Sequence, residues 1–151
     1  MTTSPNAEPS IRAANQEDAE AIARLATELG YPTALDEMRT RVERLLQSDA
    51  YFLVVAEQGS EVIGWIAAER RLLLESGERA EIVGLIVTQS ARRAGTGQAL
   101  VSAAEDWARR QGLPRMAVRS SVTRAESHPF YERLGYVRAK TQHAYLKTLT
   151  D

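Results

Sequence analysis

The chain has 151 residues, 44% of them hydrophobic, and a formal net charge of -1, which suits one domain with a buried core and leaves no room for a second. Acidic and basic residues are interleaved, without a basic block, and this argues against a protein that binds nucleic acid or a membrane surface. The chain contains no cysteine, which excludes disulfides, thiolate metal sites and a cysteine nucleophile.

The chain is expected to form one domain after a short tail. Residues 1–9 are polar, hold two prolines and lack the apolar segment of a signal sequence. They are therefore predicted to be a flexible tail, followed by a single domain over residues 10–151. No run reaches the roughly 20 apolar residues that a membrane helix needs. The sequence predicts no membrane partner and a cytoplasmic location.

A strand and two helices are predicted first along the chain. Residues 11–13 read as a short strand. Asn15 stands three residues before Asp18, which is typical of a helix N-cap, and apolar residues then recur at helical spacing as far as Gly30. A second amphipathic helix is predicted over residues 35–46 by the same spacing.

Three antiparallel strands are predicted next. Residues 51–57 and 62–71 are rich in β-branched and aromatic residues, and the short turn 58–61 between them favours a hairpin. A second turn at residues 76–77 leads into a strand over residues 79–88. Because each connection is a tight turn, neighbouring strands are expected to run in opposite directions.

The rest of the chain predicts a helical crossover and a closing segment. A helix over residues 98–111 stops at Gly112. The strand over residues 116–120 is expected to lie parallel to the strand before that helix, because a helical crossover joins parallel neighbours. A short helix around residues 130–134 and a terminal strand over residues 136–149 complete a mixed α/β sheet.

The segment that joins the third hairpin strand to the crossover helix has the chemistry of an anion site. Residues 87–100 read Val-Thr-Gln-Ser-Ala-Arg-Arg-Ala-Gly-Thr-Gly-Gln-Ala-Leu. The first four N–H groups of a helix lack intrahelical acceptors and carry partial positive charge, so phosphates bind there. Gly95 and Gly97 let a pyrophosphate approach the backbone, and Arg92 and Arg93 add cationic side chains. The predicted ligand is a polyphosphate.

Two common nucleotide motifs are excluded, and a third pattern fits. No Gly-x-x-x-x-Gly-Lys string is present, and Leu100 stands where a dinucleotide fingerprint needs Gly or Ala. Residues 92–97, Arg-x-x-Gly-x-Gly, instead resemble the acyl-CoA pyrophosphate loop of the GNAT superfamily of N-acetyltransferases. Residues 128–136, His-Pro-Phe-Tyr-Glu-Arg-Leu-Gly-Tyr, are similar to the superfamily's Phe-Tyr-x-x-x-Gly-aromatic segment. The resemblance extends over about residues 10–149.

The resemblance implies a fold and a cosubstrate. The expected fold is a GNAT-like mixed, mostly antiparallel twisted sheet flanked by helices, with two splayed parallel central strands. The pantetheine arm of acetyl-CoA, the implied cosubstrate, would lie between those two strands. Arg124 stands where many members carry asparagine; it would reach a CoA phosphate, and an exposed loop arginine is the alternative interpretation. The cofactor-binding residues nominated in this way are Leu85, Ile86, Val87, Arg92, Arg93, Ala94, Gly95, Thr96, Gly97, Gln98 and Arg124.

Acetyl transfer from a thioester to an amine needs a route for the amine proton, a donor to the oxyanion and an acid for the leaving thiolate. Glu81 is the candidate base by analogy with other members, and a solvated strand-end carboxylate is the alternative interpretation. Tyr131 matches the tyrosine that many members use as general acid, and a phenol with a pKa of about 10 can protonate a thiolate whose pKa is about 8.5. A backbone N–H near Leu85 is the implied oxyanion donor, because superfamily members carry a β-bulge that Gly84 would favour.

The acceptor is less specified by the sequence. In the superfamily, the segment between the first two helices and the last hairpin shape the acceptor pocket, which nominates Tyr31, residues 72–75 and Tyr145. All three would equally fit a packing role. Acidic residues near the hairpin would attract a cationic amine, although arginines lie beside them: Glu69, Glu75 and Glu78.

The leading prediction is an acetyl-CoA-dependent N-acetyltransferase that acts by direct attack in a ternary complex. The acceptor would be the primary amine of a small molecule or of a protein. A non-catalytic acyl-CoA-binding regulatory module is the alternative. No metal is expected, because the only two histidines, His128 and His143, are scattered. No nucleic-acid partner is expected, and a homodimer is left open.

Overall fold

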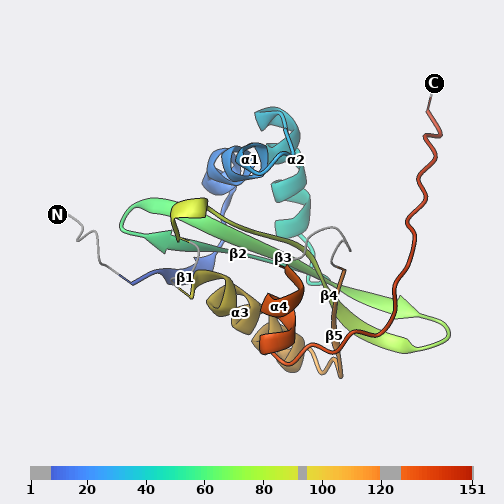
Figure 1. Ribbon diagram of the computed structural model, residues 1–151. Helices are drawn as coiled ribbons and strands as arrows, with labels where there is room; N and C mark the ends of the chain where they lie inside the picture. The colour runs from blue at the N-terminus through green and yellow to red at the C-terminus, as the bar shows by residue number, and fades with distance from the viewer. Residues whose placement is uncertain (1–7, 92–94, 120–126, 151) are drawn as a thin grey trace. The chain divides into compact units, whose positions relative to one another are not determined.

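The structure, a computed structural model, describes residues 8–91, 95–119 and 127–150 (Figure 1). The chain divides into two units, Met1–Val118 and Arg119–Asp151. The first unit contains the described sheet, and the second contains a short helix.

The first unit folds around a five-stranded sheet whose strands lie in chain order. Tight turns join the second, third and fourth strands, so these pair antiparallel, and the helical connection before the fifth strand makes the last pair parallel. The predicted strand directions are confirmed. The strands are β1 (Ser10–Ala13), β2 (Tyr51–Gln58), β3 (Glu61–Leu73), β4 (Gly77–Val87) and β5 (Met116–Val118).

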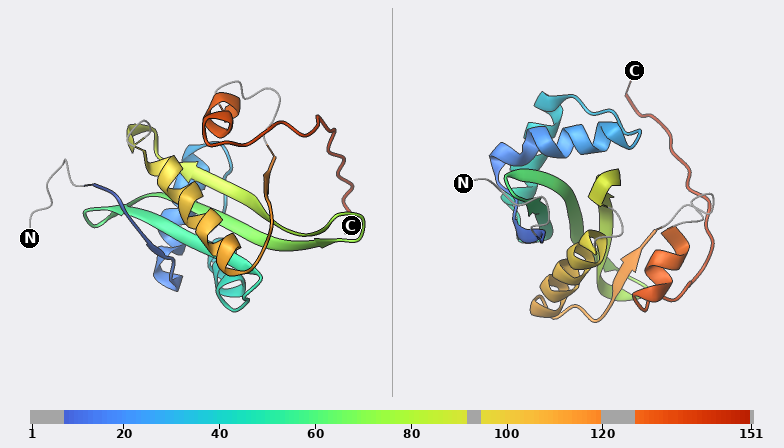
Figure 2. Two further views of the ribbon diagram at one scale, coloured as in Figure 1. Left: turned by 90° about the horizontal axis from the view of Figure 1, so that it is seen from below. Right: turned by 60° about the vertical axis from the view of Figure 1, so that its left-hand side comes forward.

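Helices cover both faces of this sheet. Two amphipathic helices, α1 and α2, turn their apolar sides to one face, and α3 packs on the opposite face (Figure 2). Trp107 of α3 stacks on Phe52 of β2 with ring centroids 5.4 Å apart. Full burial of a side chain such as Leu100 contributes about 1.5–3 kcal/mol. The helices are α1 (Ala19–Glu28), α2 (Leu35–Leu46) and α3 (Thr96–Arg110), with single 3₁₀ turns at Gln16–Asp18 and Gln89–Ala91.

The predicted N-cap before α1 is part of an ion-pair network that ties the first helical segment to the sheet. Asn15 and Asp18 form a capping box. The Asn15 side chain accepts a hydrogen bond from a backbone N–H of the first turn, and the Asp18 side chain accepts one from the N–H of Asn15. The guanidinium of Arg12 donates to both oxygens of Asp18, at 2.8 and 2.9 Å, and to Glu57 at 3.0 Å. These bonds, above all the one from Arg12, hold the pKa of Asp18 below its usual value. Asp18 in turn raises the pKa of Arg12.

Asp18→Asn is expected to lower the free energy of unfolding by about 2 kcal/mol at pH 7, because it weakens a cap and a charged hydrogen bond in a site that is 6% exposed. The depressed pKa of Asp18 stabilises the fold above the unfolded value of about 3.9, and this stabilisation is lost as the pH falls through the lower folded pKa. Urea unfolding from pH 7 to below pH 4 measures both effects. The exposed neighbour change Glu17→Gln serves as control, and a gap between wild type and Asp18→Asn that does not narrow as the pH falls below 4 would refute the assignment.

The second unit contains α4 (Ser127–Arg133), in agreement with the short helix predicted there. The prediction of a terminal strand over residues 136–149 is wrong, because residues 134–150 form neither helix nor strand. A strand exists through its ladder with a neighbour, and β-propensity alone does not supply one. The parallel pair of β4 and β5 therefore stands at an edge of the described sheet rather than at its centre. Four apolar side chains of this segment are between 88% and 99% exposed, namely Val137, Tyr145, Leu146 and Leu149.

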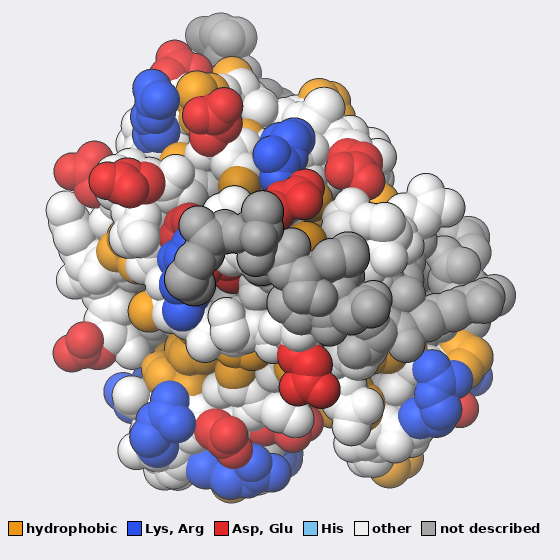
Figure 3. All heavy atoms as spheres, turned by 90° about the vertical axis from the view of Figure 1, so that its left-hand side faces the viewer, with side chains coloured by type: hydrophobic (Ala, Val, Ile, Leu, Met, Phe, Trp, Pro, Cys, Tyr) orange, Lys and Arg blue, Asp and Glu red, His pale blue; other side chains and the backbone are white. Residues whose placement is uncertain are grey.

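Charges of both signs are dispersed over the surface. On the face shown in Figure 3, the acidic and basic side chains that are coloured lie interspersed with one another. Within the described ranges, no helix combines the length and the apolar character needed to span a membrane.

Candidate functional site

The strand β4 contains a bulge near its middle, at the position where the family resemblance implies one. Ala67 of β3 pairs with Gly84, and Ala68 pairs with Ile82, so Val83 is an extra residue without its own partner on β3. A bulge bends its strand and increases the local twist. Val83 is 51% exposed, which leaves an accessible surface at the bend.

The ladder between the two parallel strands ends where this bulge begins. Their ladder consists of the pairs Ala80–Met116, Glu81–Ala117 and Ile82–Val118. The remaining residues of β4, 83–87, continue past the last of these pairs. Within the described residues, β5 itself ends at Val118, so β4 continues without a β5 partner from the bulge onward.

The hydrogen-bond pattern shows which amides of β4 face the β5 side. Thr88 N donates to Ile63 O of the β3 side at 2.8 Å. Successive residues of a strand point their N–H groups to alternate sides, so Ile86 faces β3 like Thr88, whereas Leu85 and Val87 face the opposite edge. The side chain of Ile86 is in the core, 8% exposed. Of the three nominated strand residues, Leu85 and Val87 therefore point their backbone N–H groups to the β5 side of β4.

The N-terminus of α3 has the open backbone that an anion site needs. Gly95 caps the helix with φ 82° and without a side-chain hydrogen bond to the helix, and a Cβ at this position would meet nothing within 4 Å. Thr96 is only 1% exposed, and its Oγ1 has no hydrogen-bond partner in the described part of the chain. Gly97 and Gln98 follow in the first turn. Among the nominated loop residues, Arg92, Arg93, Ala94 and Arg124 lie outside the described residues.

Trp65 covers the bulge from the face of α1 and α2. A Cβ on Gly84 would lie 2.7 Å from Cζ3 of the indole, so glycine allows this close approach. The Nε1 of Trp65 is buried and makes no hydrogen bond within the described ranges. A buried N–H without an acceptor is rare in folded proteins, and it places an unused donor beside the bulge.

Glu81 belongs to a cluster of four charged side chains that sequence reasoning did not assemble. It is neither solvated nor alone: its side chain is 6% exposed, Oε2 accepts from Arg71 Nη1 at 3.0 Å, and Oε1 accepts from Arg79 Nη2 at 3.2 Å. Glu69 lies opposite Glu81, and Arg71 lies opposite Arg79. The alternation of strand side chains puts all four on one face. In the sequence, Glu69 and Arg71 are two residues apart on one strand of the hairpin, and Arg79 and Glu81 are two residues apart on the other. This spacing was the signal from which the cluster could have been predicted.

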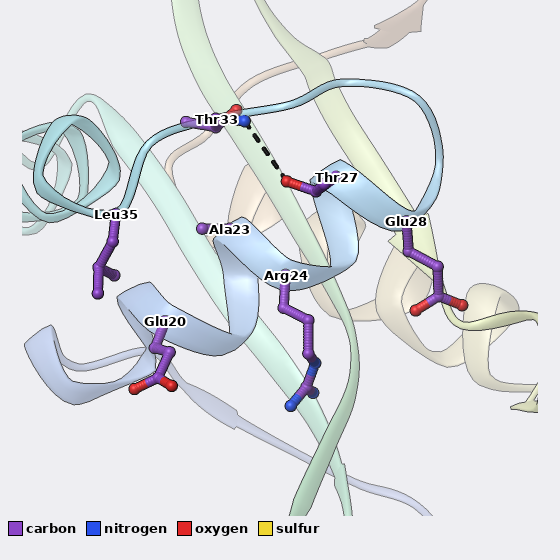
Figure 4. Close-up of a pocket in the computed structure, with 7 residues that line it drawn as sticks. All are labelled: Glu20, Ala23, Arg24, Thr27, Glu28, Thr33 and Leu35. Atoms are coloured by element: carbon purple, nitrogen blue, oxygen red, sulfur yellow. Dashed lines mark hydrogen bonds between the residues drawn. The ribbon is translucent and has the colours of Figure 1, made fainter.

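A pocket of about 460 Å³ opens along α1 and the connection to α2 (Figure 4). Thr33 of that connection donates its N–H to Thr27 Oγ1 at 3.4 Å. Glu28, at the end of α1, accepts from Thr88 Oγ1 at 3.2 Å, which links the rim of the pocket to the end of β4. The pocket therefore includes the connection that the resemblance assigns to acceptor recognition. Its lining residues are Glu20, Ala23, Arg24, Thr27, Glu28, Thr33 and Leu35.

Tyr131 lies on α4 in the second unit, and neighbouring aromatic rings fix its orientation. Its ring meets Phe130 edge-on at 5.1 Å and Tyr136 edge-on at 5.8 Å between centroids. The N–H of Tyr136 donates to Tyr131 O at 3.1 Å, which closes the turn after the helix. Tyr131 is half-buried. Its assignment as general acid stays a prediction.

The other nominated acceptor residues are exposed to different degrees. Tyr31 is 51% exposed, Leu72 at the hairpin is 69% exposed and Tyr145 is 92% exposed. Within the described ranges, no three His, Asp or Glu side chains gather in a way that would hold a metal ion.

Comparison with known proteins gives consistent results. A family model described as the Acetyltransferase (GNAT) family matches residues 17–136. YhdJ of Bacillus subtilis (strain 168), named as an uncharacterized N-acetyltransferase, is 31% identical over 113 residues, which are 74% of this chain and 77% of that protein. Aminoglycoside N(6')-acetyltransferase type 1 of Klebsiella aerogenes is 34% identical over 103 residues, 66% of this chain and 67% of that protein.

The fold is also shared with solved structures. The structure of AAC(6')-Iy in complex with the bisubstrate analog CoA-S-monomethyl-acetylneamine has a TM-score of 0.85 and 23% identity, over 94% of this chain and 99% of that chain. At this identity the likeness shows the fold. The match of the family model extends over most of the chain and includes the bulged strand, α3 and α4. The protein is therefore a member of the GNAT family of acetyltransferases.

Proposed function

We propose that the protein transfers the acetyl group of acetyl-CoA to the primary amine of a small cationic acceptor. One observation carries the proposal: the ladder of β4 with β5 ends at a bulge, and the amides of Leu85 and Val87 beyond it face the β5 side of the strand. The same strand leads through one 3₁₀ turn to the N-terminus of α3. A ligand with amides along an extended arm and a pyrophosphate at one end fits this order of features.

The residues of this chain would hold acetyl-CoA through backbone groups. The N–H groups at the start of α3, with Gly95, Thr96, Gly97 and Gln98, would bind the pyrophosphate, and Thr96 Oγ1 supplies an unused hydroxyl there. The family resemblance implies that the pantetheine arm would run beside Val87 as a neighbouring strand does. Leu85 N–H, next to the bulge, would donate to the thioester oxygen and stabilise the oxyanion that forms on it.

The chemical step would be direct attack in a ternary complex. The ammonium of the bound acceptor first releases one proton to solvent. The neutral amine nitrogen then forms a bond to the thioester carbonyl carbon and loses a second proton, for which Glu81 is the candidate acceptor. The carbon–sulfur bond then breaks, and the departing thiolate takes the phenolic proton of Tyr131. General acid and base groups of this kind contribute about 10²- to 10⁴-fold each to the rate. The products are an amide and free CoA.

The names of the relatives support an amine acceptor. One is an aminoglycoside N(6')-acetyltransferase, and AAC(6')-Iy binds an analog that joins CoA to acetylneamine. Exposed carboxylates of Glu20 and Glu28 on the rim of the α1 pocket would attract a positively charged acceptor. Small polyamines and aminoglycosides are therefore the first acceptors to test.

The first test is the thermal midpoint with acetyl-CoA, desulfo-CoA, ATP or NAD. We expect a rise only with the CoA species. At 100 times its dissociation constant, a ligand adds about 2.7 kcal/mol, which corresponds to about 5–10 °C for a chain of this length.

The second test follows free CoA while acetyl-CoA is mixed with a panel of amines that includes neamine, lysine and a peptide with a free N-terminus. Release of CoA that depends on the amine supports acetyl transfer. Binding of CoA without transfer to any amine would instead favour the acyl-CoA-binding module. Stabilisation by ATP or NAD alone would overturn the proposal.

A further inference from the structure

We propose that Glu69 is the residue that binds the positively charged amine of the acceptor, an inference that rests on the proposed acetyl transfer. Glu69 lies on β3, two residues from Ala67, which pairs with the bulge residue Gly84. Two residues of strand span about 7 Å. Glu69 is therefore close enough for a carboxylate to hold an amine that reacts at the bulge.

The side chain of Glu69 lies on the face of the sheet to which Gly84 of the bulge also belongs. Side chains two apart on a strand share a face, so Glu69 follows Trp65 and Ala67 in one row. Trp65 covers Gly84 on this same face.

The two carboxylates of the charged cluster differ in what they can still bind. Glu81 is almost fully buried, and both of its oxygens accept from an arginine. Glu69 is 26% exposed, and within the described ranges its one ion pair is a 3.7 Å contact with Arg71 Nε, too long for a hydrogen bond. Arg71 directs its shorter bond to Glu81. The charge of Glu69 is therefore only weakly neutralised and is open to a cation.

The other acidic residues near the hairpin are less suitable. Glu78 pairs with Leu72 and lies on the opposite face from Glu81, because its position differs by an odd number of residues. Glu75 lies in the turn between β3 and β4. Of the three carboxylates expected to attract a cationic amine, only Glu69 lies in the same row of β3 side chains as Ala67, the residue that pairs with Gly84 of the bulge.

Glu69→Gln separates a charge effect from a shape effect, since glutamine keeps the size of the side chain. Steady-state kinetics would compare benzylamine, which is cationic at pH 7.5, with aniline, which is neutral. For Glu69→Gln we expect the KM for benzylamine to rise about ten- to a hundredfold, the range of a charge-assisted hydrogen bond. The KM values for aniline and for acetyl-CoA should stay within about threefold. Glu69→Asp should recover part of the benzylamine affinity.

Glu78→Gln is the matched control, because it removes the same charge from the other face of the same hairpin. Thermal midpoints of both variants establish that each is folded. An unchanged KM for benzylamine in Glu69→Gln, or an equal loss with benzylamine and aniline, would overturn the inference while leaving acetyl transfer intact. A wild-type protein that acetylates no amine would remove the proposed function and this inference together.

Discussion

Replacing Tyr131 with phenylalanine is expected to lower the turnover number of acetyl transfer by about 10²- to 10⁴-fold, the contribution of a general acid. The departing thiolate would then leave without a proton donor. The ring remains, so the edge-on contacts with Phe130 and Tyr136 should persist. Affinity for acetyl-CoA and the thermal midpoint should change little. Stopped-time assays of CoA release and a titration with desulfo-CoA measure the two quantities separately.

Tyr136→Phe is the matched control for this experiment. Tyr136 touches the ring of Tyr131 and also carries a phenol, so the control removes a neighbouring hydroxyl from the same part of the chain. Its turnover number should stay within about threefold of the wild type. Equal turnover of Tyr131→Phe and wild type would remove Tyr131 from the mechanism, and a loss that both variants share would point to packing instead of acid catalysis.

Replacing Glu81 with glutamine is expected to lower the free energy of unfolding by about 2–3 kcal/mol. The loss is smaller than for a fully buried ion pair, because both arginines are partly exposed to solvent. The change leaves Arg71 and Arg79 opposite each other on neighbouring strands without the carboxylate between them. For a chain of this length the thermal midpoint should fall by about 5–10 °C. Glu78→Gln, an exposed change on the same strand, should stay within about 0.5 kcal/mol of the wild type.

The same variant tests whether Glu81 also serves as the base. A missing base is compensated when the pH is raised, because the amine then loses its proton to solvent. We expect the activity of Glu81→Gln, relative to wild type, to recover between pH 7.5 and pH 10. A relative loss that is equal at every pH would leave Glu81 as an anchor for the arginines and nothing more. An unchanged thermal midpoint would speak against the anchor.

The order and direction of the elements could be predicted because they depend on local signals. Turn residues at 58–61 and 76–77 and the helical spacing of residues 98–111 determine the antiparallel and parallel pairs. The capping pair Asn15 and Asp18 was also visible in the sequence. The terminal strand could not be predicted reliably, because a strand needs a partner edge and propensity describes only the chain itself.

The site was predictable in outline and not in its electrostatics. The glycine loop follows from residue types and the bulge near Gly84 from the family resemblance, and the structure has a glycine-capped helix start and a bulge at these places. The environment of Glu81 was missed. Its burial and its two arginine partners depend on the register between β3 and β4, which a single sequence does not specify. The close approach of Trp65 to Gly84 has the same origin.

The two tryptophans lie on opposite faces of the sheet and in different surroundings. Trp107 is stacked on Phe52 beneath α3, whereas Trp65 covers the glycine of the bulge. Indole fluorescence depends on the polarity and rigidity around the ring, so the emission of Trp65 is sensitive to whatever lies along the bulged strand while that of Trp107 forms a constant background. The protein thus carries an intrinsic optical reporter at the bulge of β4, readable without any attached dye.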